Sequence, residues 1–187
     1  MKPEKYFLEE EWRFSSVAIV KYKPQYYNEK GVYCKDEWTE RGEIGSVFNG
    51  QIFTIEEYMA VEQKYVDAAL KIMDLSNCKY LTLAYEAYTL KGARQSIIEM
   101  MTGRFKEYDK EYCDFLASIY LGQRLNKEQV AKLVRLNLRI LAETSLTNES
   151  RHLEFHFGGD SYMYCRTRLP KEVLRTELEP LGMYVIG

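Results

Sequence analysis

The sequence contains no apolar run that approaches the roughly 20 residues needed for a membrane-spanning helix. Its first residues, MKPEKYFLEEEW, also lack the uninterrupted apolar core of a secretory signal peptide. The four cysteines are widely spaced and form no CxxC pair, so a disulfide framework is not expected. We therefore expect a cytoplasmic protein with reduced thiols and no membrane partner.

Glycine-rich nucleotide-binding motifs are missing as well. Neither GxGxxG nor GxxxxGK[ST] occurs, and Gly158-Gly159 does not open a glycine-rich loop into a helix. The net charge is only −2, which gives no reason to expect a nucleic-acid partner. Residues 1–63 are more acidic, with 12 acidic and 8 basic residues, a net charge of −4. This asymmetry favours a basic partner for the N-terminal half.

No internal repeat, low-complexity tract or long linker interrupts the 187 residues. A chain of this length fits one domain that buries roughly 70% of the surface of its unfolded chain. The composition, 46% hydrophobic and 29% charged, is typical of a packed globule rather than of a disordered chain. We predict a single domain over residues 1–187.

Two capping signals mark the clearest helices. Thr54 and Glu57 form a capping box, with Phe53 and Tyr58 placed as its hydrophobic staple, before an apolar pattern at helical spacing that continues to about residue 75. Asn126 and Gln129 stand in the same relation before a second helix. The buried stripe predicted for that helix is Val130, Leu133, Val134, Leu138 and Leu141, and the predicted solvated side is Lys132, Arg135 and Arg139.

Alternating apolar residues predict the strands. Residues 12–22 fit a strand that Pro24 ends, and residues 79–88 fit a strand, although a helix is nearly as consistent there. In the strand interpretation, Leu81, Leu83, Tyr85 and Ala87 share one face. The other expected elements are helices over 93–101, 107–121 and 170–178, short strands over 31–35 and 51–53, and an edge strand over 183–186. The pattern predicts an α+β fold with three to five helices packed on a small antiparallel sheet that ends in a C-terminal β-hairpin.

That hairpin is predicted from the segment HLEFHFGGDSYMYC at residues 152–165. Gly-Gly suits a two-residue turn in which both central residues have positive φ. With that turn, Phe155 pairs with Tyr162, Leu153 with Tyr164, and His152 with Cys165. One face then collects Leu153, Phe155, Phe157, Tyr162 and Tyr164, and the other collects His152, Glu154, His156, Ser161, Met163 and Cys165.

The second of these faces has the residue types of a zinc site. His152 and His156 lie about 13 Å apart along one strand, at ~3.3 Å per residue, which is too far for both to bind one metal ion. Cys165 next to His152 is one neighbour pair without an orienting group. We therefore assign no catalytic residue, metal or cofactor. A small hydrolase or metal-dependent enzyme using His152, His156 and Cys165 stays as the alternative.

The acidic segment DEWTERGEIGSV at residues 36–47 has a different character. It places an amphipathic tryptophan among carboxylates on a predicted loop, which suits the anchor of an interface with a basic partner. The candidate contact residues are Glu37, Trp38, Glu40 and Glu43. The alternative is that Trp38 folds inward and packs in the core.

Three segments together resemble a bacterial family. They are EWTERGEIGSVFNGQIFTIEEYMAVEQKYVDAAL at 37–70, LNKEQVAKLVRLNLRILAE at 125–143, and HLEFHFGGDSYMYC at 152–165. They are similar to immunity proteins of contact-dependent growth inhibition and other polymorphic toxin systems. The chain departs from the family pattern at Gly159, where an aromatic residue is usual, and it lacks a tryptophan after Arg139.

The resemblance implies a non-enzymatic cytoplasmic protein. Such a protein binds the C-terminal domain of its cognate toxin, often a nuclease, and occludes the active site of that domain. No contact residue follows from the resemblance, because immunity proteins differ most at the surface that faces the toxin.

Overall fold

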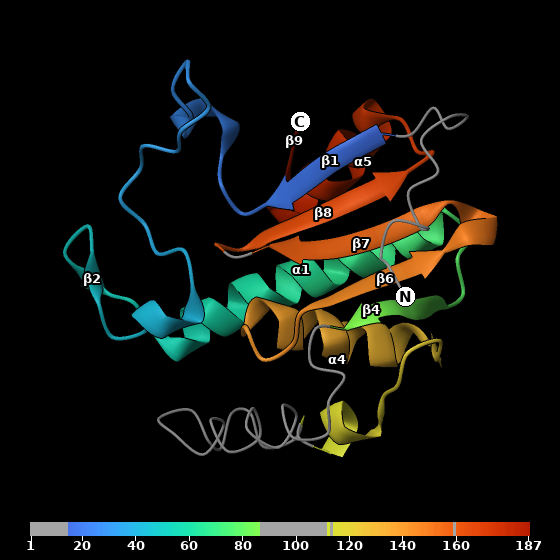
Figure 1. Cartoon of the computed structure of the whole chain (residues 1–187). Helices are drawn as coiled ribbons and strands as arrows, with labels where there is room; N and C mark the ends of the chain where they lie inside the picture. Colours follow the sequence, from blue (N-terminus) through green and yellow to red (C-terminus); the bar gives the residue numbers. More distant parts are fainter. Residues whose placement is uncertain (1–14, 87–111, 113, 159) are drawn as a thin grey trace.

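The computed structural model describes residues 15–86, 112, 114–158 and 160–187. Its main feature is a seven-stranded sheet in the order β5-β4-β6-β7-β8-β1-β9, in which every neighbouring pair is antiparallel. Helices α1, α4 and α5 all cover the same face of this sheet (Figure 1). The predicted α+β class is confirmed, with a larger sheet than expected.

The strands of the sheet come from both ends of the described chain. They are β1 (Ser15–Val20), β4 (Leu81–Glu86), β5 (Arg124–Leu125), β6 (Thr144–Asn148), β7 (Leu153–Gly158), β8 (Tyr162–Thr167) and β9 (Tyr184–Ile186). A separate two-stranded sheet pairs β2 (Val47–Phe48) with β3 (Gln51–Ile52). Residues 31–35 form no strand beyond an isolated bridge between Tyr27 and Tyr33, so that prediction was wrong.

The helices are α1 (Ile55–Leu75), α4 (Lys127–Leu138) and α5 (Lys171–Leu178), and residues 112 and 114–118 are also helical. The predicted helix over 93–101 lies outside the described residues. None of the described helices is long and apolar enough to cross a membrane.

Both predicted capping boxes are confirmed. The Thr54 hydroxyl accepts a hydrogen bond from the Glu57 amide at 3.2 Å, and the Glu57 carboxylate accepts one from the Thr54 amide at 2.9 Å. Asn126 and Gln129 make the same reciprocal pair at 3.0 Å before α4. These bonds satisfy amides that would otherwise have no partner in the first turn of each helix.

The core fills the space between the sheet and the helices. Its largest fully buried side chains include Tyr65 and Ile72 of α1, Leu133 of α4, and Phe155 of β7. Strand β4 confirms the strand interpretation for residues 81–86, and Ala87 lies outside the described residues. A bulge after Leu83 changes the face of the strand. Tyr85 is therefore 41% exposed instead of buried, and Glu86 is buried.

The predicted solvated side of α4 is wrong for Arg139 and only partly right for Arg135, whose side chain is 18% exposed and pairs with Glu62. Arg139 is only 3% exposed, because the helix ends at Leu138 and Ile140 adopts a positive φ of 58° that turns the chain. The Arg139 guanidinium makes two hydrogen bonds of 2.7 and 2.9 Å to the buried Glu62 carboxylate of α1. This ion pair joins the C-terminal end of α4 to α1.

Candidate functional site

The β7–β8 hairpin has a different register from the predicted one. Phe155 pairs with Cys165 and not with Tyr162, a shift of three residues along the second strand. Gly158 is the last residue of β7, and the positive φ values of 57° and 59° belong to Asp160 and Ser161, directly before β8. Because side chains alternate along a strand, an odd shift exchanges its two faces.

The exchange of faces moves the two tyrosines out of the predicted packing face. Met163 and Cys165 point into the core, whereas Tyr162 and Tyr164 share the outer face with His156. The Tyr164 ring lies close over Gly158, where a β-carbon would stand 3.0 Å from it. The prediction that all the aromatic residues of this hairpin share the packing face was therefore wrong.

The residues of the alternative enzyme are not brought together. Cys165 is 1% exposed on the inner face of the sheet, and burial raises the pKa of its thiol. His156 is exposed on the outer face, and His152 lies before β7 with a positive φ of 51°. Within the described residues, no group of three or more histidine, cysteine, aspartate or glutamate side chains is placed to hold a metal ion.

The sequence prediction missed one polar pair on the outer face. The hydroxyl of Ser145, in β6, lies 3.1 Å from the Nδ1 atom of His156, in the neighbouring strand β7. Hydrolysis through such a pair also needs a group that orients the imidazole and donors that stabilise the oxyanion. An exposed pair on the surface of a sheet does not by itself define an active site.

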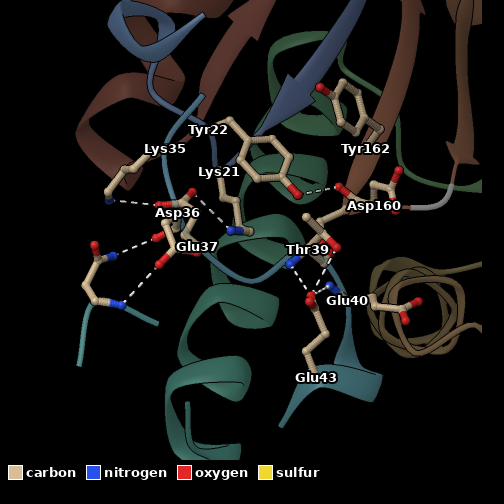
Figure 2. Close-up of polar contacts among 12 residues, drawn as sticks. Lys21, Tyr22, Lys35, Asp36, Glu37, Thr39, Glu40, Glu43, Asp160 and Tyr162 are labelled. Carbon is tan, nitrogen blue, oxygen red and sulfur yellow. Dashed lines mark hydrogen bonds and ion pairs between the residues drawn. The ribbon is translucent and has the colours of Figure 1, made fainter. Parts of the chain in front are cut away.

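The candidate loop is built around Glu37. Its carboxylate lies 3.1 Å from the Lys21 ammonium and 2.8 Å from that of Lys35 (Figure 2). Burial alone would raise the pKa of the Glu37 carboxyl, but the hydrogen bond from Lys35 and the charge of Lys21 outweigh it and hold this pKa below its ordinary value. Burial lowers the pKa of Lys21 more than Glu37 raises it. Glu37 therefore attaches the loop to the end of β1.

Trp38 packs inward, as in the second of the two interpretations of this residue. Its ring stacks on Phe53 with centroids 4.4 Å apart and an angle of 13°, in a small cluster with Ile44 and Tyr58. The Lys21 ammonium lies over the Trp38 ring, 4.0 Å from its centroid. Trp38 is half-buried and packs the loop onto the start of α1, instead of standing free as an anchor.

Glu43 also serves the loop itself. Its carboxylate accepts hydrogen bonds from the Thr39 amide at 2.6 Å, the Thr39 hydroxyl at 3.1 Å and the Glu40 amide at 3.2 Å (Figure 2). Burial would raise the pKa of the Glu43 carboxyl, but these donors outweigh it and lower that pKa. Glu40 is half-buried, and its side chain takes part in a capping box with Glu43 around the short helical turn Arg41–Glu43, with its carboxylate close to Gly42.

The tip of the β7–β8 hairpin lies against the same loop. The Ser161 hydroxyl donates to the Thr39 carbonyl at 2.7 Å, and the Tyr22 hydroxyl donates to the Asp160 carbonyl at 2.7 Å (Figure 2). The Tyr65 hydroxyl of α1 donates to the Ser161 carbonyl. These three bonds hold two residues with positive φ in one conformation, and strained backbone of this kind is often found at functional sites.

The structure thus joins two segments that the sequence separates by more than 110 residues. Of the four predicted contact residues, Glu37 and Glu43 hold the loop together, Trp38 packs inward, and Glu40 is half-buried in its capping box with Glu43. Asp160 is exposed beside them and was missed, because its position depends on the hairpin register. We call the surface formed by residues 36–43 and 160–161 the loop–tip surface.

Comparison with known proteins adds no assignment. No protein-family model matches the chain, and no curated protein or solved structure is significantly similar to it.

Proposed function

We propose that the chain is an immunity-type protein that binds a cognate bacterial toxin domain and neutralises it by covering its active site. The observation that carries the proposal is the loop–tip surface. Its polar groups bond to one another, while the exposed Asp160 and the half-buried Glu40 lie at its edge. A protein in this role needs no catalytic residues.

Rigidity is the first property that supports binding. Two lysines hold Glu37, three donors hold Glu43, and three hydrogen bonds hold the hairpin tip. A surface that is already ordered loses little conformational entropy when a partner binds, so more of the contact energy appears as affinity.

Charge is the second property. Asp160 is exposed and Glu40 is half-buried, so both carboxylates are accessible to a partner at the edge of the loop–tip surface. Carboxylates around a contact surface speed association with a cationic partner and exclude partners of like charge. A toxin that acts on nucleic acid has a cationic active site, which is the kind of surface that such carboxylates suit.

The proposal is tested with the C-terminal domain of the polypeptide encoded directly upstream of this chain. Co-expression of the wild-type chain should restore growth to cells that produce this domain, and the two purified proteins should form a one-to-one complex. A wild-type chain that neither restores growth nor binds the domain overturns the proposed function.

The contact surface is tested with a neutralising pair of substitutions. Glu40→Gln with Asp160→Asn should weaken binding about tenfold and reduce its dependence on salt. Asparagine at position 160 keeps a residue type that tolerates positive φ. The matched control, Glu128→Gln with Glu172→Gln, removes two exposed carboxylates from α4 and α5 and should bind within about twofold of wild type. Equal affinities for the two double variants would remove the loop–tip surface from the proposal.

A further inference from the structure

The β2–β3 hairpin presents an apolar pair to solvent beside the loop–tip surface. Val47 and Ile52 face each other across its two strands and are 61% and 64% exposed. The hairpin belongs to a sheet of its own and projects from the body of the molecule at the left edge of Figure 1. Two directly paired aliphatic side chains at such a position form a patch, which a single exposed residue does not.

The hairpin is fixed from its other side. Phe48 packs edge-on against Phe53 with ring centroids 6.2 Å apart, within the cluster that also contains Trp38. Two backbone hydrogen bonds of 2.8 Å continue the pairing of the strands, from Gly45 to Phe53 and from Phe53 to Ser46. These contacts attach the hairpin, and with it the apolar pair, to the cluster of Trp38, Phe53 and Tyr58.

The turn of the hairpin is joined to the acidic loop. Asn49 and Gly50 both have positive φ, as a two-residue turn between twisted strands requires. The Asn49 side-chain amide donates to the Asp36 carbonyl at 2.6 Å, and the Asn49 backbone amide lies 3.4 Å from the Asp36 carboxylate. The apolar pair and the loop–tip surface are thus parts of one continuous region.

Carboxylates flank the apolar pair along the chain, although one of them, Glu37, is paired with Lys21 and Lys35. Residues 36–57 contain six acidic side chains and one basic side chain, Arg41, a net charge of −5. Glu40 and Glu43 precede the hairpin, and Glu56 and Glu57 follow it in the first turn of α1. An apolar centre with a charged rim is the usual composition of a protein–protein interface.

We infer that Val47 and Ile52 are the apolar anchor of the toxin-binding surface, and that they enter an apolar depression on the partner that is surrounded by lysine and arginine side chains. This inference rests on the proposed function. The acidic rim selects the cationic partner, and the two aliphatic side chains supply affinity when the contact removes them from water. A few residues of this kind usually carry most of the binding energy of an interface.

The test uses the same upstream toxin domain and the double variant Val47→Thr, Ile52→Thr. Threonine keeps the β-branched shape that strands favour and puts a hydroxyl group in place of one methyl group of Val47 and of the ethyl group of Ile52. The variant should fold as the wild type does, by circular dichroism and thermal unfolding, and should bind at least about tenfold more weakly. The matched control is Leu121→Thr with Val173→Thr, at residues that are 48% and 37% exposed elsewhere in the molecule, and it should keep wild-type affinity.

A second pair of variants tests the charge of the partner. Val47→Lys and Val47→Glu both remove the same valine, so a difference between them reports the charge that faces position 47. The lysine variant should bind more weakly than the glutamate variant, by a ratio that decreases as salt is added.

The outcomes separate the two proposals. Wild-type binding with equal affinity for the threonine double variant and its control overturns the anchor and leaves the proposed function standing. Tighter binding by Val47→Lys than by Val47→Glu overturns the cationic rim of the partner. Absence of wild-type binding overturns both proposals.

Discussion

Glu62 forms the ion pairs between α1 and the arginines at the end of α4. It is 1% exposed, and its carboxylate accepts hydrogen bonds from Arg139 and, at 2.7 Å, from Arg135. The Arg139 guanidinium also lies 4.4 Å from the ring centroid of Tyr112. Two cations beside one buried carboxylate are compatible with a stable fold only while each charge keeps its partners.

Replacing Glu62 with glutamine should therefore destabilise the protein. The substitution keeps the shape of the side chain but leaves two guanidinium groups without the charge that compensates their burial, at a cost of about 3–5 kcal/mol in the free energy of unfolding. Urea unfolding measures this cost. The control Glu128→Gln removes an exposed carboxylate that is paired with Lys132 within α4 and should cost under about 1 kcal/mol. A cost for Glu62→Gln as small as that of the control would contradict the structural role of the ion pair.

At the scale of elements, the loop of residues 36–43 owes its conformation to ionised carboxylates. Glu37 and Glu43 each have a pKa below the ordinary 4.5, because amides, a hydroxyl and lysine side chains bond to their charged forms more strongly than burial opposes them. A pKa that folding lowers adds stability above the ordinary value, and that stability is lost as the pH falls through the folded pKa.

This gives a pH-dependent prediction for the loop. Between pH 7 and pH 5 the variants Glu37→Gln and Glu43→Gln should each unfold at lower urea concentration than the wild type. As the pH falls below about 4.5 towards 3, the wild type loses the same interactions, and its advantage over both variants should shrink. The measurement is a series of urea unfolding curves across this range. A difference that stays constant down to pH 3 would show that the charged forms contribute nothing.

Sequence patterns predicted the elements that depend on neighbouring residues. The caps at Thr54 and Asn126 were predicted because each bond joins residues three positions apart. The register of the β7–β8 hairpin was not, since Gly158-Gly159 matched one turn while the chain places positive φ at Asp160 and Ser161. Those two residues are held by Tyr22, Tyr65 and Thr39, which no local pattern identifies as their partners.

Contacts between residues that are far apart in the sequence also explain what the prediction missed in the candidate site and in the core. The acidic loop was predicted from its composition, but the role of each carboxylate within it depends on contacts such as Lys21 to Glu37, across 16 residues. Arg139 was expected in solvent because its partner Glu62 lies 77 residues earlier in the chain. The sequence alone does not show whether a charged residue at the end of a helix is exposed or forms a buried ion pair with a distant residue.

For the whole molecule, the order of the sheet sets where the structure opens most readily. Strand β1 has hydrogen-bonded neighbours on both sides, β8 and β9, and its residues Val17, Ile19 and Val20 are buried. The β2–β3 hairpin has only one pair of two-residue strands, with Val47 and Ile52 in solvent.

Hydrogen exchange should therefore differ between these two regions. Amides of β1 should exchange only through global unfolding, whereas amides of the β2–β3 hairpin should exchange faster through local opening. Exchange followed by mass spectrometry in increasing denaturant distinguishes the two routes, because only the first depends strongly on denaturant. Equal protection of both regions would contradict this difference. Binding of the proposed partner should then slow exchange at the hairpin more than at β1.

The place of β1 between β8 and β9 also affects how the protein is made. A ribosome that has completed β1 must add the 147 residues from Val20 to Thr167 before the whole of β8 exists to pair with it. At ordinary rates of synthesis this takes on the order of 10–30 s. During that time an apolar strand stands without its neighbours, so the nascent chain is a natural client for chaperones that bind extended apolar segments. The sheet closes only after β8 and β9 have left the ribosome.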